Sequence, residues 1–235
     1  MYFERNRKKI RMLWWMFIIF SNLLLGVLSV KYNLSNSIKI LIFWSLFIVE
    51  IIAWFVINQL WYKEFLRKVE SLTPILEEEN DADRFIVENL SLLKGKKSMQ
   101  IIAILKINIC EGYCKKGDYQ KAKAHLTEIN SKKIHGLLRV YYQLIFIYVL
   151  FYLKETEEAM KQMANQCDTL LKFENSPELG AMISIVRIFQ LLTQKKKQEA
   201  NDLLHLSKEK WKKSNYQKDF YYLEALCEEI LHSPS

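Results

Sequence analysis

A single carboxylate interrupts a long apolar segment near the N-terminus. Glu50 is the one charged residue between Ile40 and Ile57. A carboxylate near the centre of a bilayer costs about 2.5–3.5 kcal/mol on insertion scales, so such a group is usually protonated, paired or exposed to water. In an antiparallel pair of spans, Ser21 and Asn22 would lie at the depth of Glu50. The sequence therefore predicts an intramembrane polar contact in which Asn22 and Glu50 share a hydrogen bond.

Three roles for this acid are open at this point. It can hold the two spans or several copies of the chain together, contact a second membrane protein, or take part in ion or proton passage. Two spans with one acid make a poor pathway for ions. The two roles that are contacts are therefore favoured.

The cysteines and histidines do not form a recognisable metal site or active site. Cys110 and Cys114 are one helical turn apart, but tetrahedral zinc needs four convergent nitrogen or sulfur ligands, and no CxxC pair or histidine is close in the sequence. The HExxH, G-x-S-x-G and glycine-rich phosphate-binding motifs do not occur. We therefore expect a non-catalytic protein without a cofactor or metal, in which both cysteines are small packing residues.

The composition predicts that long helices position these residues. The chain has 235 residues with only six Gly and three Pro. Collagen and turn-dense β architectures need far more, since strands in such folds are separated by a chain-breaking residue about every 8–12 residues. An all-α fold is what remains.

The net charge of +8 belongs mainly to the N-terminal segment. Positions 1–70 contain 10 basic and 4 acidic side chains, and positions 71–235 contain 24 and 22. Acidic residues are interspersed with the lysine clusters of the second part, so we expect no nucleic-acid binding. These lysines lie mostly at predicted turns and helix ends, where they are either solvated or face anionic lipid headgroups.

Two apolar segments within positions 1–72 predict a transmembrane hairpin. The spans cover about residues 12–30 and 40–62, each close to the roughly 20 residues that a helix needs to cross the hydrocarbon layer. Five of the six Trp lie between Met1 and Tyr62, as is typical of aromatic side chains near membrane interfaces. The alternatives are buried core helices and, for the first segment, a cleaved signal peptide. The length of that segment and the lack of an A-x-A-like cleavage site favour a retained anchor.

Basic residues flank the two spans unequally. Five precede the first span, two lie between the spans, and three follow the second span. The positive-inside rule therefore predicts an integral membrane protein of the cell membrane, embedded in the lipid bilayer with both termini in the cytosol. All four cysteines follow the second span, so we expect no disulfide in this reducing compartment.

After Leu72 the sequence predicts a second domain, 73–235, built from shorter helices. Thr73-Pro74 and Ser176-Pro177 are helix starts, in which a hydroxyl residue caps the helix and Pro occupies its first position. Helices are expected at 82–94, 98–115, 119–130, 134–153, 155–173, 177–193, 197–213 and 216–232.

One joint between these helices carries a recognisable spacing. Tyr113, Gly117 and Ala122 resemble the joint of a tetratricopeptide repeat, a helix–turn–helix unit of about 34 residues. Two later segments keep the nine-residue step from Tyr113 to Ala122, from Leu150 to Ala159 and from Leu191 to Ala200. The resemblance covers about residues 98–213 and implies an α-solenoid of antiparallel helix pairs in the cytosol. The residues that it assigns to repeat packing are Cys110, Tyr113, Gly117, Ala122, Ala159 and Ala200.

Tetratricopeptide-like domains generally bind a peptide or a partner protein on their concave face, and the resemblance implies the same use here. The candidate partner surface comprises Tyr113, Tyr141, Tyr142, Tyr148 and Tyr152. The alternative is that these side chains pack in the core, because residues 140–153 carry no charge and suit a central buried helix. That segment is too short to cross a bilayer, but it could rest on a membrane surface.

Two functions follow from these observations. The first is a non-catalytic, membrane-anchored helical-repeat adaptor that binds a protein or peptide partner at the cytosolic membrane face. The second is an accessory or immunity-type subunit of a membrane transporter or receptor, which recognises that second membrane protein through the transmembrane hairpin. Self-association through the hairpin is compatible with either function.

Overall fold

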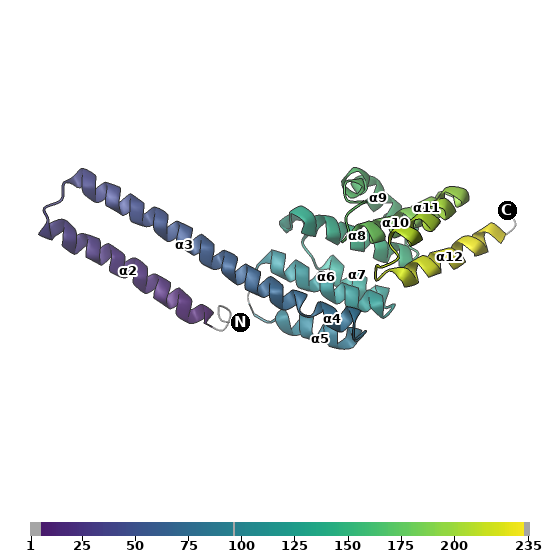
Figure 1. The fold of residues 1–235 in the computed structure, drawn as a ribbon, viewed down its shortest axis with the longest axis horizontal. Helices are drawn as coiled ribbons and strands as arrows, with labels where there is room; N and C mark the ends of the chain where they lie inside the picture. Colours follow the sequence, from purple (N-terminus) through teal and green to yellow (C-terminus); the bar gives the residue numbers. More distant parts are fainter. Residues whose placement is uncertain (1–5, 96, 233–235) are drawn as a thin grey trace. The chain divides into compact units, whose positions relative to one another are not determined.

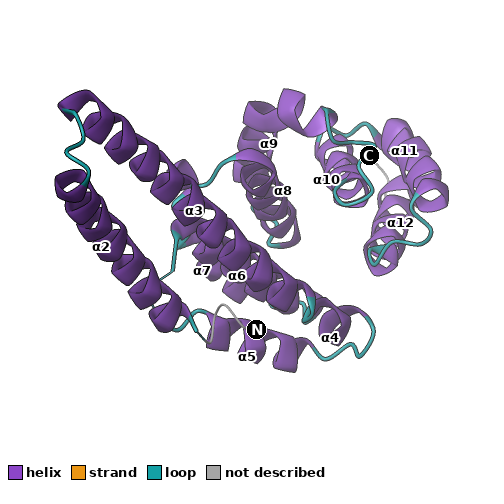
Figure 2. Cartoon of the chain, turned by 60° about the vertical axis from the view of Figure 1, so that its left-hand side comes forward, coloured by secondary structure: helices purple, strands orange, loops and turns teal. Residues whose placement is uncertain are grey.

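The computed structural model describes residues 6–95 and 97–232. Every regular element within them is a helix, and no strand occurs among these residues (Figure 2). The predicted all-α fold is thus confirmed for the described part of the chain. The chain divides between Leu72 and Thr73 into two compact units, which we call the hairpin unit (residues 1–72) and the helical unit (residues 73–235).

The hairpin unit consists of two long helices joined by a short turn. Helix α2 spans Arg7–Lys31 and helix α3 spans Asn36–Glu70, and the two run antiparallel side by side (Figure 1). Asn33 adopts a left-handed conformation in the turn, with φ 46°. Ser35 then caps α3, because its side chain accepts a hydrogen bond from the backbone N–H of Ile38.

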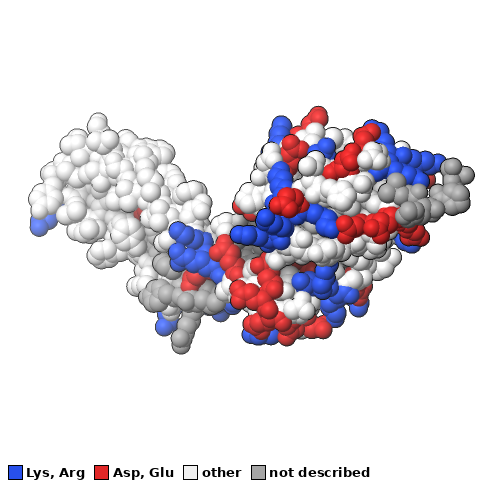
Figure 3. Space-filling view, turned by 45° about the vertical axis from the view of Figure 1, so that its right-hand side comes forward, with Lys and Arg blue, Asp and Glu red and all other residues white. Residues whose placement is uncertain are grey.

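Both helices of the hairpin unit are long and apolar enough to cross a membrane. Their large apolar side chains are mostly exposed, as Phe20 (66% exposed) and Leu41 (67%) illustrate. Most of the visible surface of this unit carries no charged side chain (Figure 3). Both helices extend beyond the predicted spans, 12–30 and 40–62, into the flanking segments that contain the charged residues.

The helical unit contains the remaining helices. They are α4 (Thr73–Glu77), α5 (Ala82–Leu92), α6 (Met99–Lys115), α7 (Tyr119–Thr127), the 3₁₀ helix η1 (Ser131–Lys133), α8 (Gly136–Tyr152), α9 (Thr156–Leu171), α10 (Gly180–Thr193), α11 (Lys197–Lys210) and α12 (Gln217–His232). Each helix predicted for this part of the chain occurs. The ends differ by up to three residues, as in 119–130 predicted against Tyr119–Thr127 observed. The start predicted at Ser176-Pro177 is also wrong by three residues, because residues 177–179 form a turn and α10 begins at Gly180.

Helices of this unit pack both against their neighbours in the chain and against every second helix. α6 packs on α7, α8 on α9 and α10 on α11, while α8 also contacts α6 and α10, and α10 contacts α12 (Figure 2). The core lies around α8 and α10, where Ile147, Leu150, Ile185 and Ile188 are fully buried. α8 is therefore the central buried helix that its uncharged sequence suggests.

Three turns of the helical unit share one backbone conformation. Each contains a residue with positive φ, namely Gly117 (75°), Lys154 (61°) and Lys195 (60°). The next residue donates its backbone N–H to the carbonyl five positions earlier. These bonds are Asp118 to Tyr113 (2.9 Å), Glu155 to Leu150 (3.0 Å) and Lys196 to Leu191 (2.9 Å). A left-handed residue followed by this bond closes the end of a helix and redirects the chain into the next one.

The residue five positions after each left-handed residue is a fully buried alanine. These are Ala122, Ala159 and Ala200, all in the first turns of the second helix of a pair. A methyl group at this place lets the two helices approach closely, whereas a larger side chain would hold them apart. The turn and the alanine together therefore set the geometry of each pair.

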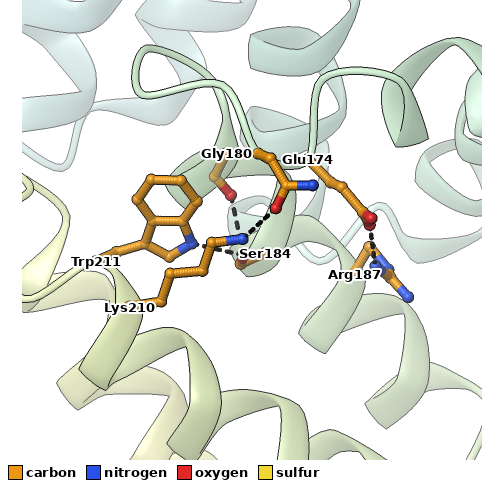
Figure 4. A network of polar contacts seen from close by, with 7 residues as sticks. Glu174, Gly180, Ser184, Arg187, Lys210 and Trp211 are labelled. Carbon is orange, nitrogen blue, oxygen red and sulfur yellow. Dashed lines mark hydrogen bonds and ion pairs between the residues drawn. The ribbon is translucent and has the colours of Figure 1, made fainter.

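A network around Trp211 joins the start of α10 to the end of α11 (Figure 4). The indole N–H of Trp211 donates to Oγ of Ser184 (3.1 Å), and that hydroxyl donates to the carbonyl of Gly180 (2.9 Å). A Cβ atom at Gly180 would lie 2.3 Å from the Trp211 ring, so this position requires glycine. An ion pair between Arg187 and Glu174 (3.0 Å) flanks the same contact.

Candidate functional site

The hairpin unit contains the polar contact centred on Glu50. Oγ of Ser21 donates to Oε1 of Glu50 (3.1 Å) and also lies 3.0 Å from the carbonyl of Ile18. Ser21 is 9% exposed, while most side chains around it on α2 are open. The serine therefore lies where α2 and α3 touch, and it satisfies one oxygen of the acid from within the same hairpin.

No hydrogen bond joins Asn22 and Glu50, which are both described residues. Its side-chain amide donates to the carbonyl of Ile18, one turn earlier on its own helix (2.8 Å). The expectation of an Asn22–Glu50 hydrogen bond is therefore replaced by a Ser21–Glu50 bond. Adjacent positions on a helix point about 100° apart, so only one of the two residues can face α3.

The helical unit contains a groove of about 690 Å³. Side chains from α4, α6, α7 and α8, from the start of α10 and the segment before it, and from the α11–α12 connection and the start of α12 line it. α8 contributes Tyr141, Ile145 and Tyr148, which follow one another at spacings of four and three residues and so form one stripe on the helix. A cavity of this size accommodates several residues of a peptide or a small molecule.

Glu111 of α6 presents an unusual carboxyl group to this groove. Burial raises the pKa of this carboxyl to about 8, and the nearby charge of Glu77 adds to the effect. Among the described residues, no hydrogen bond or ion pair to the Glu111 carboxyl occurs. Glu111 is therefore a half-buried acid without a bonding partner in the described part of the chain.

Asp219, at the start of α12, is the centre of a tyrosine cluster. Oδ1 of Asp219 accepts hydrogen bonds from the hydroxyls of Tyr148 (2.6 Å) and Tyr152 (2.5 Å). Tyr119 stacks on Tyr152 with ring centroids 4.5 Å apart. Burial is the largest cause that raises the pKa of each of these three tyrosines, and the charge of Asp219 adds to it. Their hydroxyls are therefore neutral donors at physiological pH.

The five tyrosines of the candidate partner surface have different surroundings. Tyr141 and Tyr148 line the groove, although Tyr148 is only 5% exposed. Tyr152 belongs to the cluster around Asp219. Tyr113 stacks on His125 (5.5 Å), and Tyr142 stacks on Phe146 (6.1 Å). The structure thus brings two of the five to the groove and uses the other three mainly in packing.

Four lysines line the groove, namely Lys115, Lys116, Lys213 and Lys218. All four are exposed, and Lys116 forms an ion pair with Asp83. The groove therefore combines carboxylates and tyrosines with exposed ammonium groups, and it offers both signs of charge to a ligand.

The residues assigned to repeat packing lie where packing needs small groups. Cys110, Ala122, Ala159 and Ala200 are fully buried, and Gly117 occupies a left-handed turn position. The sulfur atoms of Cys110 and Cys114 are 3.9 Å apart, and all four cysteines are free thiols. Among the described residues, no three His, Cys, Asp or Glu side chains converge in a way that could hold a metal ion.

The most informative groove residues were not anticipated from the sequence. They are Glu111, Tyr119, Tyr216 and Asp219. A signal for Glu111 does exist, because it lies four residues after the buried Ile107 and interrupts the apolar side of α6 in the same way that Glu50 interrupts an apolar span. No protein-family model, curated protein or solved structure matches this chain.

Proposed function

We propose that this protein is a membrane-anchored helical-repeat adaptor that binds a protein or peptide partner at the cytosolic membrane face. The observation that carries the proposal is the 690 Å³ groove, which is lined by tyrosines and by charges of both signs. Such a lining suits the mixed polar and apolar surface of a peptide segment. The two long apolar helices of the hairpin unit supply the anchor.

The three equivalent turns support a repeat architecture of the tetratricopeptide type. Gly117, Lys154 and Lys195 follow one another at steps of 37 and 41 positions, and each is followed by the same backbone bond and the same buried alanine. Contacts between every second helix are typical of stacked helix pairs, in which one set of helices lines a concave face. The groove is lined by α6, α8 and the start of α10, which would form that face.

The distribution of basic residues supports the cytosolic placement of the helical unit. Eight basic residues flank the outer ends of the two spans, against two in the connection between them. This asymmetry favours a hairpin with both ends in the cytosol. The groove would then face cytosolic partners, and the exposed lysines of the helical unit would lie in the same compartment as the anionic lipid leaflet.

Site-specific photo-crosslinking in native membranes tests the adaptor. A photoreactive amino acid is placed at Lys218, which lines the groove, and separately at Lys161, an exposed position of α9 outside it. We expect a defined partner to be captured from position 218 and not from position 161. Equal capture from both positions, or capture from neither, would contradict a partner site in the groove.

The hairpin unit supports a second candidate, an accessory or immunity-type subunit of a membrane transporter or receptor. Phe43, Trp44 and Phe47 form an aromatic group on α3, each at least 43% exposed. Close to its middle, the hairpin also carries the Ser21–Glu50 bond. An apolar aromatic surface and a polar pair inside the membrane are features through which a second membrane protein could be recognised.

Exchange of the anchor separates the two candidates. The segment from Met1 to Tyr62 is replaced by an unrelated two-span anchor of the same topology, and capture of the partner is measured again. The adaptor retains its partner, because the groove is intact. The second candidate loses its partner, because the recognition element is gone, and a photoreactive amino acid at Trp44 should capture that partner in the native chain.

A further inference from the structure

The groove of the helical unit contains a carboxyl group that the chain itself leaves without a counter-charge. Glu111 lines the groove from α6 together with Cys114 and Lys115, one helical turn further on. Neither of these residues bonds to Glu111. An acid in such surroundings costs folding stability whenever it ionises, and sites that keep such a group are frequently binding sites.

The lysines of the same groove do not supply the missing charge. Lys116 pairs with Asp83 of α5. Lys213 and Lys218 are exposed, and neither forms a bond to Glu111. Glu111 therefore differs from the acids of the surface ion pairs in this unit, such as Glu155, which pairs with Lys123.

Asp219, unlike Glu111, accepts hydrogen bonds from within the fold. Two tyrosine hydroxyls donate to one of its oxygens, so its charge is already stabilised within the fold. Tyr216, half-buried and lining the same groove, lies within electrostatic range of both acids, since each raises its pKa after the larger effect of burial. A cation that enters beside Tyr216 would therefore meet the unpaired carboxyl of Glu111 and the negative charge of Asp219.

We propose that the groove binds a peptide segment that places one Lys or Arg side chain against Glu111, with acidic residues on either side of it. The proposal deepens the adaptor function and rests on it, since it names the chemistry of the partner. The central cation would pair with Glu111, and the flanking acids would face the exposed lysines Lys115, Lys213 and Lys218. A segment with several adjacent basic residues fits less well, because those same lysines would repel it.

Oriented peptide pools test this recognition on the full chain in lipid nanodiscs. Each pool contains 12-residue peptides with randomised flanks and one fixed central residue, which is lysine, Nε-acetyl-lysine, arginine, alanine or glutamate. The bound fraction is quantified and sequenced by mass spectrometry. We expect retention of the lysine and arginine pools about tenfold above the acetyl-lysine and alanine pools, with Asp and Glu enriched in the bound flanks.

Two variants assign the preference to a residue. Glu111→Gln keeps the shape of the side chain and resembles the protonated acid, so the fold should tolerate it, and the preference for basic pools should disappear. Glu157→Gln removes one negative charge from an exposed position in the first turn of α9, outside the groove, and the preference should persist. A preference that survives in Glu111→Gln would overturn the assignment.

The outcomes also separate this inference from the adaptor function. Equal retention of all five pools by the native chain would overturn the recognition of a basic side chain and leave peptide binding intact. Retention of no pool above empty nanodiscs would contradict both. Preferential retention of the glutamate pool would show that the lysines, rather than Glu111, determine the ligand, and it too would overturn the inference.

Discussion

The two units of this chain both contain strongly apolar helices, which differ in how far the fold buries them. Helix α3 of the hairpin unit exposes most of its apolar side chains up to Leu60, whereas α8 of the helical unit buries Leu144, Ile147 and Leu150 completely. Composition alone does not distinguish them. Length does, because the 35 residues of α3 exceed what a bilayer requires and the 17 residues of α8 fall short of it. An apolar helix thus requires apolar neighbours, and only α3 of these two is long enough to find them in a membrane.

The two units also differ in whether an isolated acid has a hydrogen-bond partner. Glu50 in the hairpin has a hydroxyl donor from the facing helix, whereas Glu111 in the groove has no bonding partner among the described residues. For a helix that crosses a bilayer, as we propose for α3, an unsatisfied polar group is costly, and a partner within the fold removes that cost. At a water-accessible groove the partner can arrive later, as part of a ligand.

Matched core and surface substitutions should give the largest difference between the units. Ile147→Ala removes a fully buried side chain of α8 and should lower the free energy of unfolding by about 2–5 kcal/mol. Ile51→Ala, at a position of α3 that is 53% exposed, should change it by less than about 1 kcal/mol. Urea titration in nanodiscs, followed by circular dichroism, measures both. Similar losses for the two variants would show that Ile51 is buried by protein.

The stability of the helical unit should depend on pH through Glu111. Its pKa is about 8 in the folded chain against an ordinary value of 4.5, so the fold disfavours the ionised form. The contribution of the neutral carboxyl to the free energy of unfolding is therefore fully present below about pH 4.5. It decreases as the pH rises, and the free energy of unfolding levels off above about pH 8. The loss between these limits should be on the order of 2–5 kcal/mol, toward the lower value because the side chain keeps some access to water.

Denaturation of Glu111→Gln between pH 5 and pH 9 measures this contribution. The variant should lose less stability than the native chain as the pH rises, and the two should converge at low pH. Parallel curves for the two proteins would show that Glu111 is not responsible. The exposed Glu157→Gln serves as the control and should follow the native curve.

A smaller effect is expected from the polar pair of the hairpin. Ser21→Ala removes the donor to Glu50 and should destabilise the contact between α2 and α3 by about 0.5–1.5 kcal/mol. Asn22→Ala removes an exposed amide that bonds only within its own helix, and it should have little effect. Unfolding in mixed micelles of increasing SDS fraction compares the two. An equal loss for Asn22→Ala would contradict an orientation of α2 in which Ser21 alone faces α3.

The smallest effects should be gains in stability at the repeated turns. Lys154 and Lys195 adopt the left-handed conformation that glycine accepts without strain. Replacement of either lysine by glycine should stabilise the helical unit by about 0.5–1 kcal/mol, while Gly117→Ala should destabilise it by a similar amount. Thermal unfolding of the three variants provides the test. A loss of stability in both lysine variants would mean that these turns do not share the conformation of Gly117.

The helices could be predicted from the sequence to a large extent. Apolar periodicity, the scarcity of Gly and Pro and starts such as Thr73-Pro74 placed each helix close to its observed position. The depth of Glu50 in the hairpin could be predicted as well, because it follows from counting residues along two antiparallel helices. The choice between Ser21 and Asn22 could not, since it depends on the rotation of α2 about its own axis.

The groove could not be predicted from the sequence for a related reason. Its lining joins residues as distant as Glu77, Glu111 and Asp219, and only the packing of several helices brings them together. The tyrosines were recognised as candidates by their type, but their roles depend on which face of α8 meets which neighbour. Tyr148 and Tyr152 are one turn apart and share Asp219, yet only Tyr148 also lines the groove.

The three equivalent turns bear on how such a chain can evolve. Backbone groups make the bond that closes each turn, and Gly, Lys and Lys occupy its left-handed position. Most residue types can therefore replace the left-handed residue at a cost of about 1 kcal/mol in stability, provided that the residue five positions later remains alanine. The three turns can therefore keep one backbone path while their sequences differ.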